Sequence, residues 1–154
     1  MTGPAWPGIV LDKYRHYLSV MKKETKGKID ISQLSNPPEK NEFATAKYFA
    51  DRGKDIVFIR PSNIKENYRP DFIMDGKEWE VKNPEGKGKH TIDRNICHAA
   101  KQSDHIIFDL RHYKGNEDSY ISKLKMEFQM RVNIKQLLII KKGGELFSLG
   151  NEIS

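Results

Sequence analysis

The stretch PDFIMDGKEWEVK, residues 70–82, decides the fold. Runs of β-forming residues flank an Asp-Gly pair at 75–76, and such a pair between extended segments is a strong signal for a two-residue hairpin turn. Because side chains alternate along a strand, Glu80 and Lys82 are expected on one face of the returning strand and Trp79 on the other. The stretch therefore predicts a β-hairpin that carries a carboxylate and an ammonium group side by side.

The residues around this hairpin complete an α/β pattern. From residue 39 onward, the spacing of apolar residues predicts a helix, a strand, the hairpin, a helix, a strand, a helix and a last hairpin. The ranges are 39–53, 55–59, 70–82, 91–103, 105–110, 117–132 and 136–149. The predicted fold class is α/β, with a mixed central β-sheet flanked by helices.

The two later helices each present an apolar face at intervals of three or four residues, which is typical of a helix that packs on a sheet. The first face consists of Ile92, Ile96, Ala99 and Ala100, and the second of Ile121, Leu124, Phe128 and Val132. We expect both faces to be buried.

The first 38 residues have a different pattern. Residues 12–24 place apolar and aromatic residues at helical spacing, whereas residues 25–38 contain the Gly, Asn and Pro residues that are typical of a linker. We therefore predict an N-terminal helical extension and linker over 1–38 and a main domain over 39–154.

The composition excludes several classes of protein. The chain has 154 residues, one Cys, 27 Lys+Arg and 21 Asp+Glu, for a net charge of +6. A single Cys forms no internal disulfide and excludes Cys-rich zinc sites. No apolar run approaches the ~20 residues that span a bilayer, and residues 1–10 show no signal-peptide pattern, so we expect no membrane span. The basic balance is a weak indication of a polyanionic partner.

The hairpin offers a candidate metal site. Asp71 begins its first strand and can lie near Glu80 across the turn, and paired carboxylates attract a hard divalent cation. Lys82 could orient a nucleophilic water or stabilise charge that develops on a phosphate. Glu42, near the start of the preceding helix, could add a further carboxylate or could simply complement the helix dipole. Equally, an E-x-K triplet is often a solvated strand face, and Asp after Pro is an ordinary turn residue.

A basic segment follows the hairpin. Its loop and helix could form a phosphate-binding wall, in which the helical members recur every three or four residues and so share one face. The candidate nucleic-acid-binding residues are Lys87, Lys89, His90, Thr91, Arg94, His98 and Lys101. The alternative is a solvated basic helix with an ordinary Thr cap.

These motifs resemble a known family. Pro70-Asp71, eight intervening residues and Glu80-Val81-Lys82 resemble the signature of the PD-(D/E)XK nuclease superfamily, and the element order over 39–110 resembles its restriction-endonuclease-like core. Within it, the chain is similar to the tRNA-cleaving C-terminal toxin domains of bacterial contact-dependent growth inhibition proteins. That similarity covers about residues 40–147, including Trp79, Lys101-Gln102 and the strand QLLII.

The resemblance implies a function and roles for residues. It implies a metal-dependent ribonuclease toxin in which Asp71, Glu80 and Glu42 hold Mg²⁺ or Mn²⁺, Lys82 assists the attacking water and Gln102 helps to arrange the site. The substrate would be tRNA, cleaved in the bacterial cytoplasm after delivery within a larger secreted effector. A cognate immunity protein would neutralise the toxin.

Three other functions stay open at this point. The chain could be a DNA endonuclease of the same fold, or an inert module that binds nucleic acid or protein. It could also be a metal-free ribonuclease that uses His90 or His98.

Overall fold

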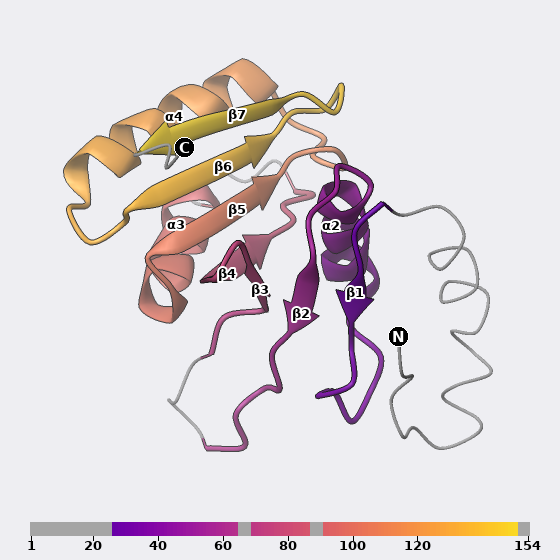
Figure 1. The fold of residues 1–154 in the computed structure, drawn as a ribbon. Helices are drawn as coiled ribbons and strands as arrows, with labels where there is room; N and C mark the ends of the chain where they lie inside the picture. The colour runs from indigo at the N-terminus through magenta and orange to yellow at the C-terminus, as the bar shows by residue number, and fades with distance from the viewer. Residues whose placement is uncertain (1–25, 65–68, 87–90, 151–154) are drawn as a thin grey trace. The chain divides into compact units, whose positions relative to one another are not determined.

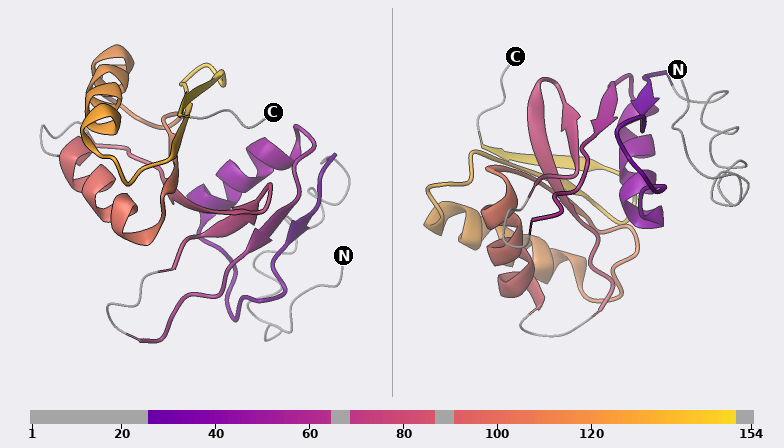
Figure 2. Two further views of the ribbon diagram at one scale, coloured as in Figure 1. Left: turned by 60° about the vertical axis from the view of Figure 1, so that its left-hand side comes forward. Right: turned by 90° about the horizontal axis from the view of Figure 1, so that it is seen from below.

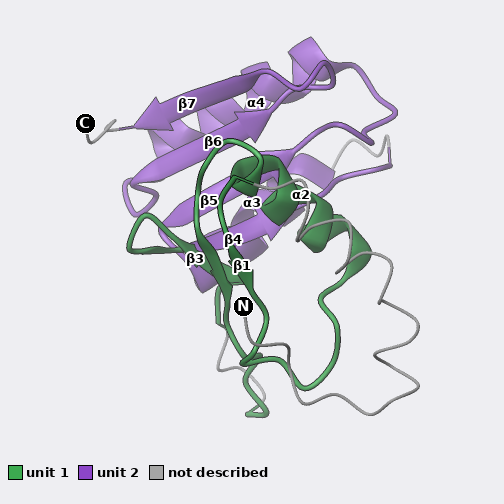
Figure 3. Ribbon diagram, turned by 45° about the vertical axis from the view of Figure 1, so that its right-hand side comes forward, with its two compact units in different colours: residues 1–78 green, residues 79–154 purple. Residues whose placement is uncertain are grey.

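The computed structural model describes residues 26–64, 69–86 and 91–150 (Figure 1). The chain divides into two compact units, residues 1–78 and 79–154 (Figure 3). Each unit combines helical structure with both parallel and antiparallel strand pairs, as the predicted α/β class with a mixed sheet requires. The helix predicted over 12–24 lies outside the described residues. None of the helices within those ranges combines the length and the apolar character needed to cross a membrane.

The first unit packs one helix on three short strands. Its elements are β1 (Ile29–Asp30), α2 (Lys40–Ala50), β2 (Ile56–Phe58) and β3 (Phe72–Met74). Strand β1 pairs with β2 in parallel, and β3 pairs with β2 antiparallel. The core mixes aliphatic and aromatic side chains, and the rings of Phe58 and Phe72 lie 5.6 Å apart in an edge contact. Helix α2 and strand β2 confirm the elements predicted over 39–53 and 55–59.

Strand β1 was not expected, because it lies within the predicted linker. Its position is set by Gly27, whose N–H donates to the Ala50 carbonyl at 2.8 Å. A Cβ at Gly27 would lie 2.0 Å from the Lys54 carbonyl oxygen, so only glycine allows this close approach. A strand of two residues is too short to leave a periodic signal in the sequence.

The Asp-Gly pair forms the predicted turn. Asp75 and Gly76 have φ values of 54° and 73°, and positive φ at both central positions is the requirement of a type I′ turn. The Asp75 carboxylate also accepts a hydrogen bond from Lys54 Nζ at 2.8 Å. The turn leads directly into β4 (Lys77–Lys82), which carries the candidate residues of the returning strand.

The second unit is built on parallel strands with helical crossovers. After β4 come α3 (Thr91–Gln102), β5 (His105–Asp109), α4 (Glu117–Met130), β6 (Gln136–Ile140) and β7 (Leu146–Gly150). The strand order is β4-β5-β6-β7, with β4, β5 and β6 parallel and β7 antiparallel. Helices α3 and α4 make the crossovers that parallel strands need and lie on the same face of these strands (Figure 2).

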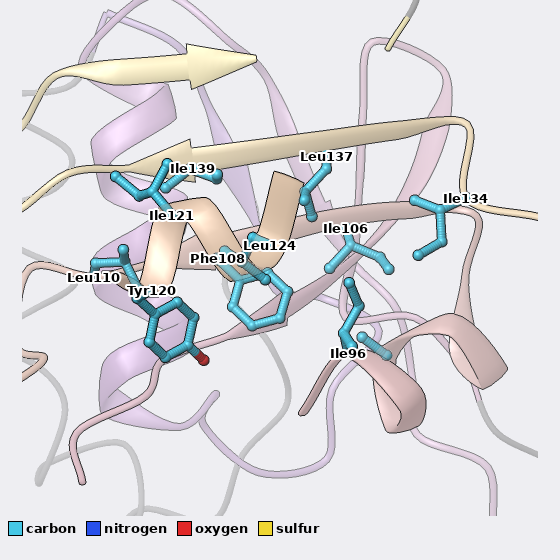
Figure 4. Close-up of a cluster of buried hydrophobic side chains, with 11 residues drawn as sticks. Ile96, Ile106, Phe108, Leu110, Tyr120, Ile121, Leu124, Ile134, Leu137 and Ile139 are labelled. Carbon is cyan, nitrogen blue, oxygen red and sulfur yellow. The ribbon is translucent and has the colours of Figure 1, made fainter. Parts of the chain in front are cut away.

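The core of the second unit lies between these helices and strands (Figure 4). Its buried members are Ile96, Ala99, Ile106, Phe108, Leu110, Tyr120, Ile121, Leu124, Ile134, Leu137 and Ile139. The apolar face predicted for residues 91–103 is confirmed. The face predicted for 117–132 is confirmed except for Val132, which is 98% exposed. That assignment is wrong because α4 ends at Met130 and the backbone turns extended at Arg131.

Candidate active site on strand β4

Glu80 and Lys82 lie on the buried strand β4, beside the core of the second unit. In the parallel pairing of β4 with β5, Glu80 is opposite Ile106 and Lys82 is opposite Phe108. Because paired residues of parallel strands share a face, both side chains point to the layer of α3 and α4. Glu80 is 3% exposed, and the Lys82 side chain is 24% exposed.

The two side chains contact each other, as the alternation along the strand predicts. Lys82 Nζ lies 3.2 Å from Glu80 Oε2. A carboxylate so deeply buried is costly unless a cation or hydrogen bonds compensate its charge. The reading of this E-x-K triplet as a solvated strand face is therefore wrong for Glu80.

The opposite face of β4 is buried as well. Trp79 lies on that face, and its ring makes an edge contact with the ring of His105 at a centroid distance of 5.0 Å. Val81 is also buried. The strand that carries Glu80 and Lys82 is thus fixed by packing on both sides, which limits the positions that the two side chains can take.

Asp71 and Glu42 belong to the first unit. Asp71 is half-buried immediately before β3, and its carbonyl accepts a hydrogen bond from the Ile59 N–H at 2.9 Å. Glu42 is half-buried in the first turn of α2, where a carboxylate complements the helix dipole. That these carboxylates share a metal with Glu80 stays a prediction from the sequence.

The basic residues of α3 share a face, as predicted. Arg94, His98 and Lys101 are exposed, whereas Ile96 and Ala99 of the same helix are buried in the core. The candidates Lys87, Lys89 and His90 lie outside the described residues. The described part of α3 therefore offers a solvent-facing basic face of suitable charge for phosphate groups.

Thr91 and Gln102 lie at opposite ends of α3. Thr91 is the first residue of the helix and Gln102 the last, and both are half-buried. At a rise of ~1.5 Å per residue, about 16 Å of helix separates them. The role of Gln102 rests on the resemblance alone and stays a prediction.

The available donors fit Mg²⁺ better than zinc. Within residues 26–64, 69–86 and 91–150, no three His, Cys, Asp or Glu side chains form a metal-binding group. Glu42, Asp71 and Glu80 all belong to the described residues, so this result gives no support to them as a ready-made set of three, whereas Mg²⁺ keeps several waters and is usually held through one or two carboxylates. The Glu80 carboxylate already has a cationic group 3.2 Å away, which shows that its surroundings accommodate positive charge.

Sequence reasoning missed a second buried charge, Asp109 at the end of β5. The residue is 3% exposed, and its carboxylate accepts hydrogen bonds from Arg111 Nε at 2.9 Å and Arg111 Nη2 at 2.7 Å. The Arg111 backbone N–H donates to the same carboxylate at 3.2 Å. The available signal was Asp-Leu-Arg directly after an apolar strand, because Asp and Arg two residues apart can meet once the strand ends.

Tyr120 places a neutral polar group in the core next to this strand. Its ring lies 6.0 Å from that of Phe108, the partner of Lys82 in the sheet. Asn95 of α3 donates to its hydroxyl at 3.4 Å. Burial raises the pKa of Tyr120 to about 12, so this hydroxyl remains protonated at neutral pH.

Comparisons with known proteins agree with this architecture. The model of the contact-dependent growth inhibition CdiA C-terminal domain family matches residues 68–146, a range that includes β4. A chain of the CdiA-CT/CdiI toxin and immunity complex from Burkholderia pseudomallei is similar in structure, with a TM-score of 0.57 and 14% sequence identity. The alignment covers 81% of this chain and 100% of that one. Among curated proteins, none matches the chain.

The fold and the β4 pair define a mixed α/β domain with a buried carboxylate–ammonium pair on a parallel strand. The chain belongs to the contact-dependent growth inhibition CdiA C-terminal domain family, whose model spans half of it. The structural neighbour, at 14% identity, supports the fold alone. Family membership supports a role as a toxin effector domain.

Proposed function

We propose that this domain is a metal-dependent ribonuclease toxin that cleaves tRNA by phosphodiester hydrolysis on a restriction-endonuclease-like core. The observation that carries the proposal is the 3.2 Å contact between Lys82 Nζ and the buried Glu80 carboxylate. A carboxylate for a hard cation and a neighbouring ammonium are the groups that cation-assisted phosphodiester hydrolysis uses. The family match supports the toxin part of the proposal.

The residues divide the work by their chemistry. Asp71, Glu80 and Glu42 would hold Mg²⁺ or Mn²⁺, whose role when bound is to activate water and to polarise the phosphoryl oxygen. The Lys82 ammonium orients the attacking water and stabilises the negative charge that grows on the phosphate. Gln102 helps to arrange the site.

Substrate binding would use the basic face of α3. Arg94, His98 and Lys101 are exposed together on this face. Contacts to phosphates position a nucleic acid without reading its sequence, and Lys and Arg side chains supply most of that affinity. The proposed binding surface also includes four residues that precede Arg94 in the sequence, namely Lys87, Lys89, His90 and Thr91.

The proposal includes an antibacterial role. We propose that the domain is delivered within a larger secreted effector, acts on tRNA in the cytoplasm of the recipient bacterium and is neutralised by a cognate immunity protein. The family match supports delivery. The neighbour's description as a toxin and immunity complex supports the existence of such a partner.

The test is cleavage of total tRNA with Mg²⁺, with and without EDTA, beside supercoiled plasmid. We expect the wild type to cut tRNA only with the metal, and Glu80→Gln to lower the rate about a thousandfold, since removal of one essential polar group costs about this much. Glu78→Gln is the matched control, because Glu78 is an exposed carboxylate on the same strand. Equal cleavage by the wild type and Glu80→Gln would contradict the proposed site.

The same assay separates the other candidate functions. Preferential cutting of the plasmid indicates a DNA endonuclease, and cleavage that survives EDTA indicates a metal-free ribonuclease. Binding of tRNA without cleavage under any metal condition indicates an inert module.

A further inference from the structure

Lys82 holds the same carboxylate that the proposed metal would use. Its ammonium lies 3.2 Å from Glu80 Oε2 on a strand that is buried on both faces. A Mg²⁺ ion held by that carboxylate would bring a second cation into contact with the same anionic group. The doubly charged ion and the ammonium repel each other at such short distances, so the two cations compete for one anionic group.

We infer that Lys82 is an internal counter-ion of Glu80 that a divalent cation displaces, so that metal binding and release of the Lys82 ammonium are one coupled event. This inference rests on the proposed function, because it assumes that Glu80 is a metal ligand. It adds a regulatory step, in which the ammonium that assists the reaction becomes available only when the metal has arrived.

The burial of Glu80 explains why a counter-ion is needed. With the residue only 3% exposed, the carboxylate has little access to water. An ionised carboxylate in such surroundings is strongly destabilising without a compensating charge. Lys82 supplies that charge while the metal is absent, and the metal supplies it afterwards.

The choice of lysine suits an exchangeable contact. Lysine carries a compact charge on a flexible four-carbon stem, whereas arginine makes a planar fork that is fixed by two hydrogen bonds. The Lys82 side chain is 24% exposed, so its ammonium has a route toward solvent when it leaves Glu80.

The inference predicts an effect of unusual sign. If the ammonium competes with the metal, its removal strengthens metal binding even though it abolishes assistance to the reaction. A lysine that only maintained the shape of the site would show the opposite, because its removal would loosen the site and weaken metal binding.

The experiment is calorimetric titration of the intact chain with Mn²⁺ alone, at fixed pH and salt concentration. We expect Lys82→Met to bind Mn²⁺ about tenfold more tightly than the wild type, within the usual range of coupling between two sites. Glu80→Gln should lose this binding. Lys123→Met is the matched control, because Lys123 Nζ forms an ion pair outside the proposed site, 3.4 Å from Asp93 Oδ1. This variant should bind Mn²⁺ with the affinity of the wild type.

A second measurement uses the wild type, so it tests the inference even if Lys82→Met unfolds because Glu80 has lost its counter-ion. The ammonium resonance of Lys82 in the wild type, assigned by its loss in Lys82→Arg, is followed by NMR during titration with Mg²⁺. We expect the resonance to shift as the site fills, and an unchanged resonance at saturating Mg²⁺ overturns the inference.

The outcomes separate this inference from the proposed function. If Lys82→Met binds Mn²⁺ no more tightly than the wild type, and the wild type shows metal-dependent cleavage, the counter-ion role of Lys82 is wrong. The proposed nuclease function is then unaffected. Absence of Mn²⁺ binding in both the wild type and Lys82→Met overturns the metal site and the counter-ion with it.

Discussion

Two buried ion pairs of the second unit have similar positions and different geometry. Glu80 on β4 and Asp109 on β5 are each 3% exposed, and each meets a cation from two residues further along the chain. Arg111 holds Asp109 through two nitrogens at 2.9 and 2.7 Å. Lys82 approaches Glu80 through one nitrogen at 3.2 Å. The two-nitrogen contact of Arg111, called the fork below, suits a permanent ion pair. The single, longer contact of Lys82 suits exchange with another cation.

The largest stability effect should follow from breaking the fork. Asp109→Ala removes the buried carboxylate that accepts two hydrogen bonds from the Arg111 guanidinium, and removal of one member of a buried pair costs about 3–5 kcal/mol. Denaturant unfolding measures this loss. Lys82→Arg is the contrasting variant, which keeps the charge beside Glu80 and should unfold at nearly the wild-type denaturant concentration. If Asp109→Ala lowers the free energy of unfolding by less than about 1 kcal/mol, the buried ion pair with Arg111 does not stabilise the fold more than a surface pair does.

A buried group that stays neutral provides the next test. The raised pKa of Tyr120, about 12 against 10.0, means that the folded state favours the protonated hydroxyl. The raised pKa therefore adds about 2–3 kcal/mol to the free energy of unfolding. This contribution is complete below pH 10 and is lost as pH rises through 12. Unfolding free energies measured from pH 9 to 12 should fall more steeply in the wild type than in Tyr120→Phe. Equal slopes would contradict the assigned pKa.

Exposed charges should affect binding rather than stability. We expect the combined variant of Arg94→Ala, His98→Ala and Lys101→Ala to weaken tRNA binding roughly tenfold and to reduce the salt slope by about 1 per lost phosphate contact. Fluorescence anisotropy over a range of salt concentrations measures both. Lys125→Ala is the control, since Lys125 lies on α4 with its ammonium 4.8 Å from the Phe147 ring. The same salt slope in all three proteins would remove α3 from the binding surface.

The smallest effect should come from a pair that is open to solvent. The side chains of Lys123 and Asp93 are 38% and 49% exposed, and surface ion pairs contribute ~0.2–1 kcal/mol. Lys123→Ala should therefore lower the free energy of unfolding by less than about 1 kcal/mol. A loss as large as that of Asp109→Ala would mean that burial does not distinguish the pairs.

The sequence was most informative where the interaction is local. The Asp-Gly turn and the alternation along β4 were enough to place Glu80 and Lys82 on one face, because both features depend on neighbouring residues. The inward face of α3 followed from the helical period in the same way. The proposed roles of these residues have a different basis, which is the family resemblance.

Other features depend on information that apolar spacing does not carry. Strand β1 exists because Gly27 fits against Lys54, and no local pattern encodes that contact. Asp109 and Arg111 are only two residues apart, but the importance of their ion pair depends on the burial of Asp109 at the end of β5, which their spacing alone does not give. Val132 was misassigned because apolar spacing continued past Met130, where the helix ends. Helix ends are less certain than helix cores in any reading of periodicity.

The parallel pairing of β4 with β5 has a consequence for folding kinetics. The two strands are joined through the whole of α3, so the chain closes a long loop before Glu80 and Lys82 gain their neighbours Ile106 and Phe108. Parallel pairing across such a loop forms more slowly than local contacts do, because the entropy of closing the loop is lost before the new contacts compensate for it. In a newly made or unfolded chain, Glu80 and Lys82 therefore lack these two neighbours, and the buried surroundings of the pair form together with the β4–β5 pairing.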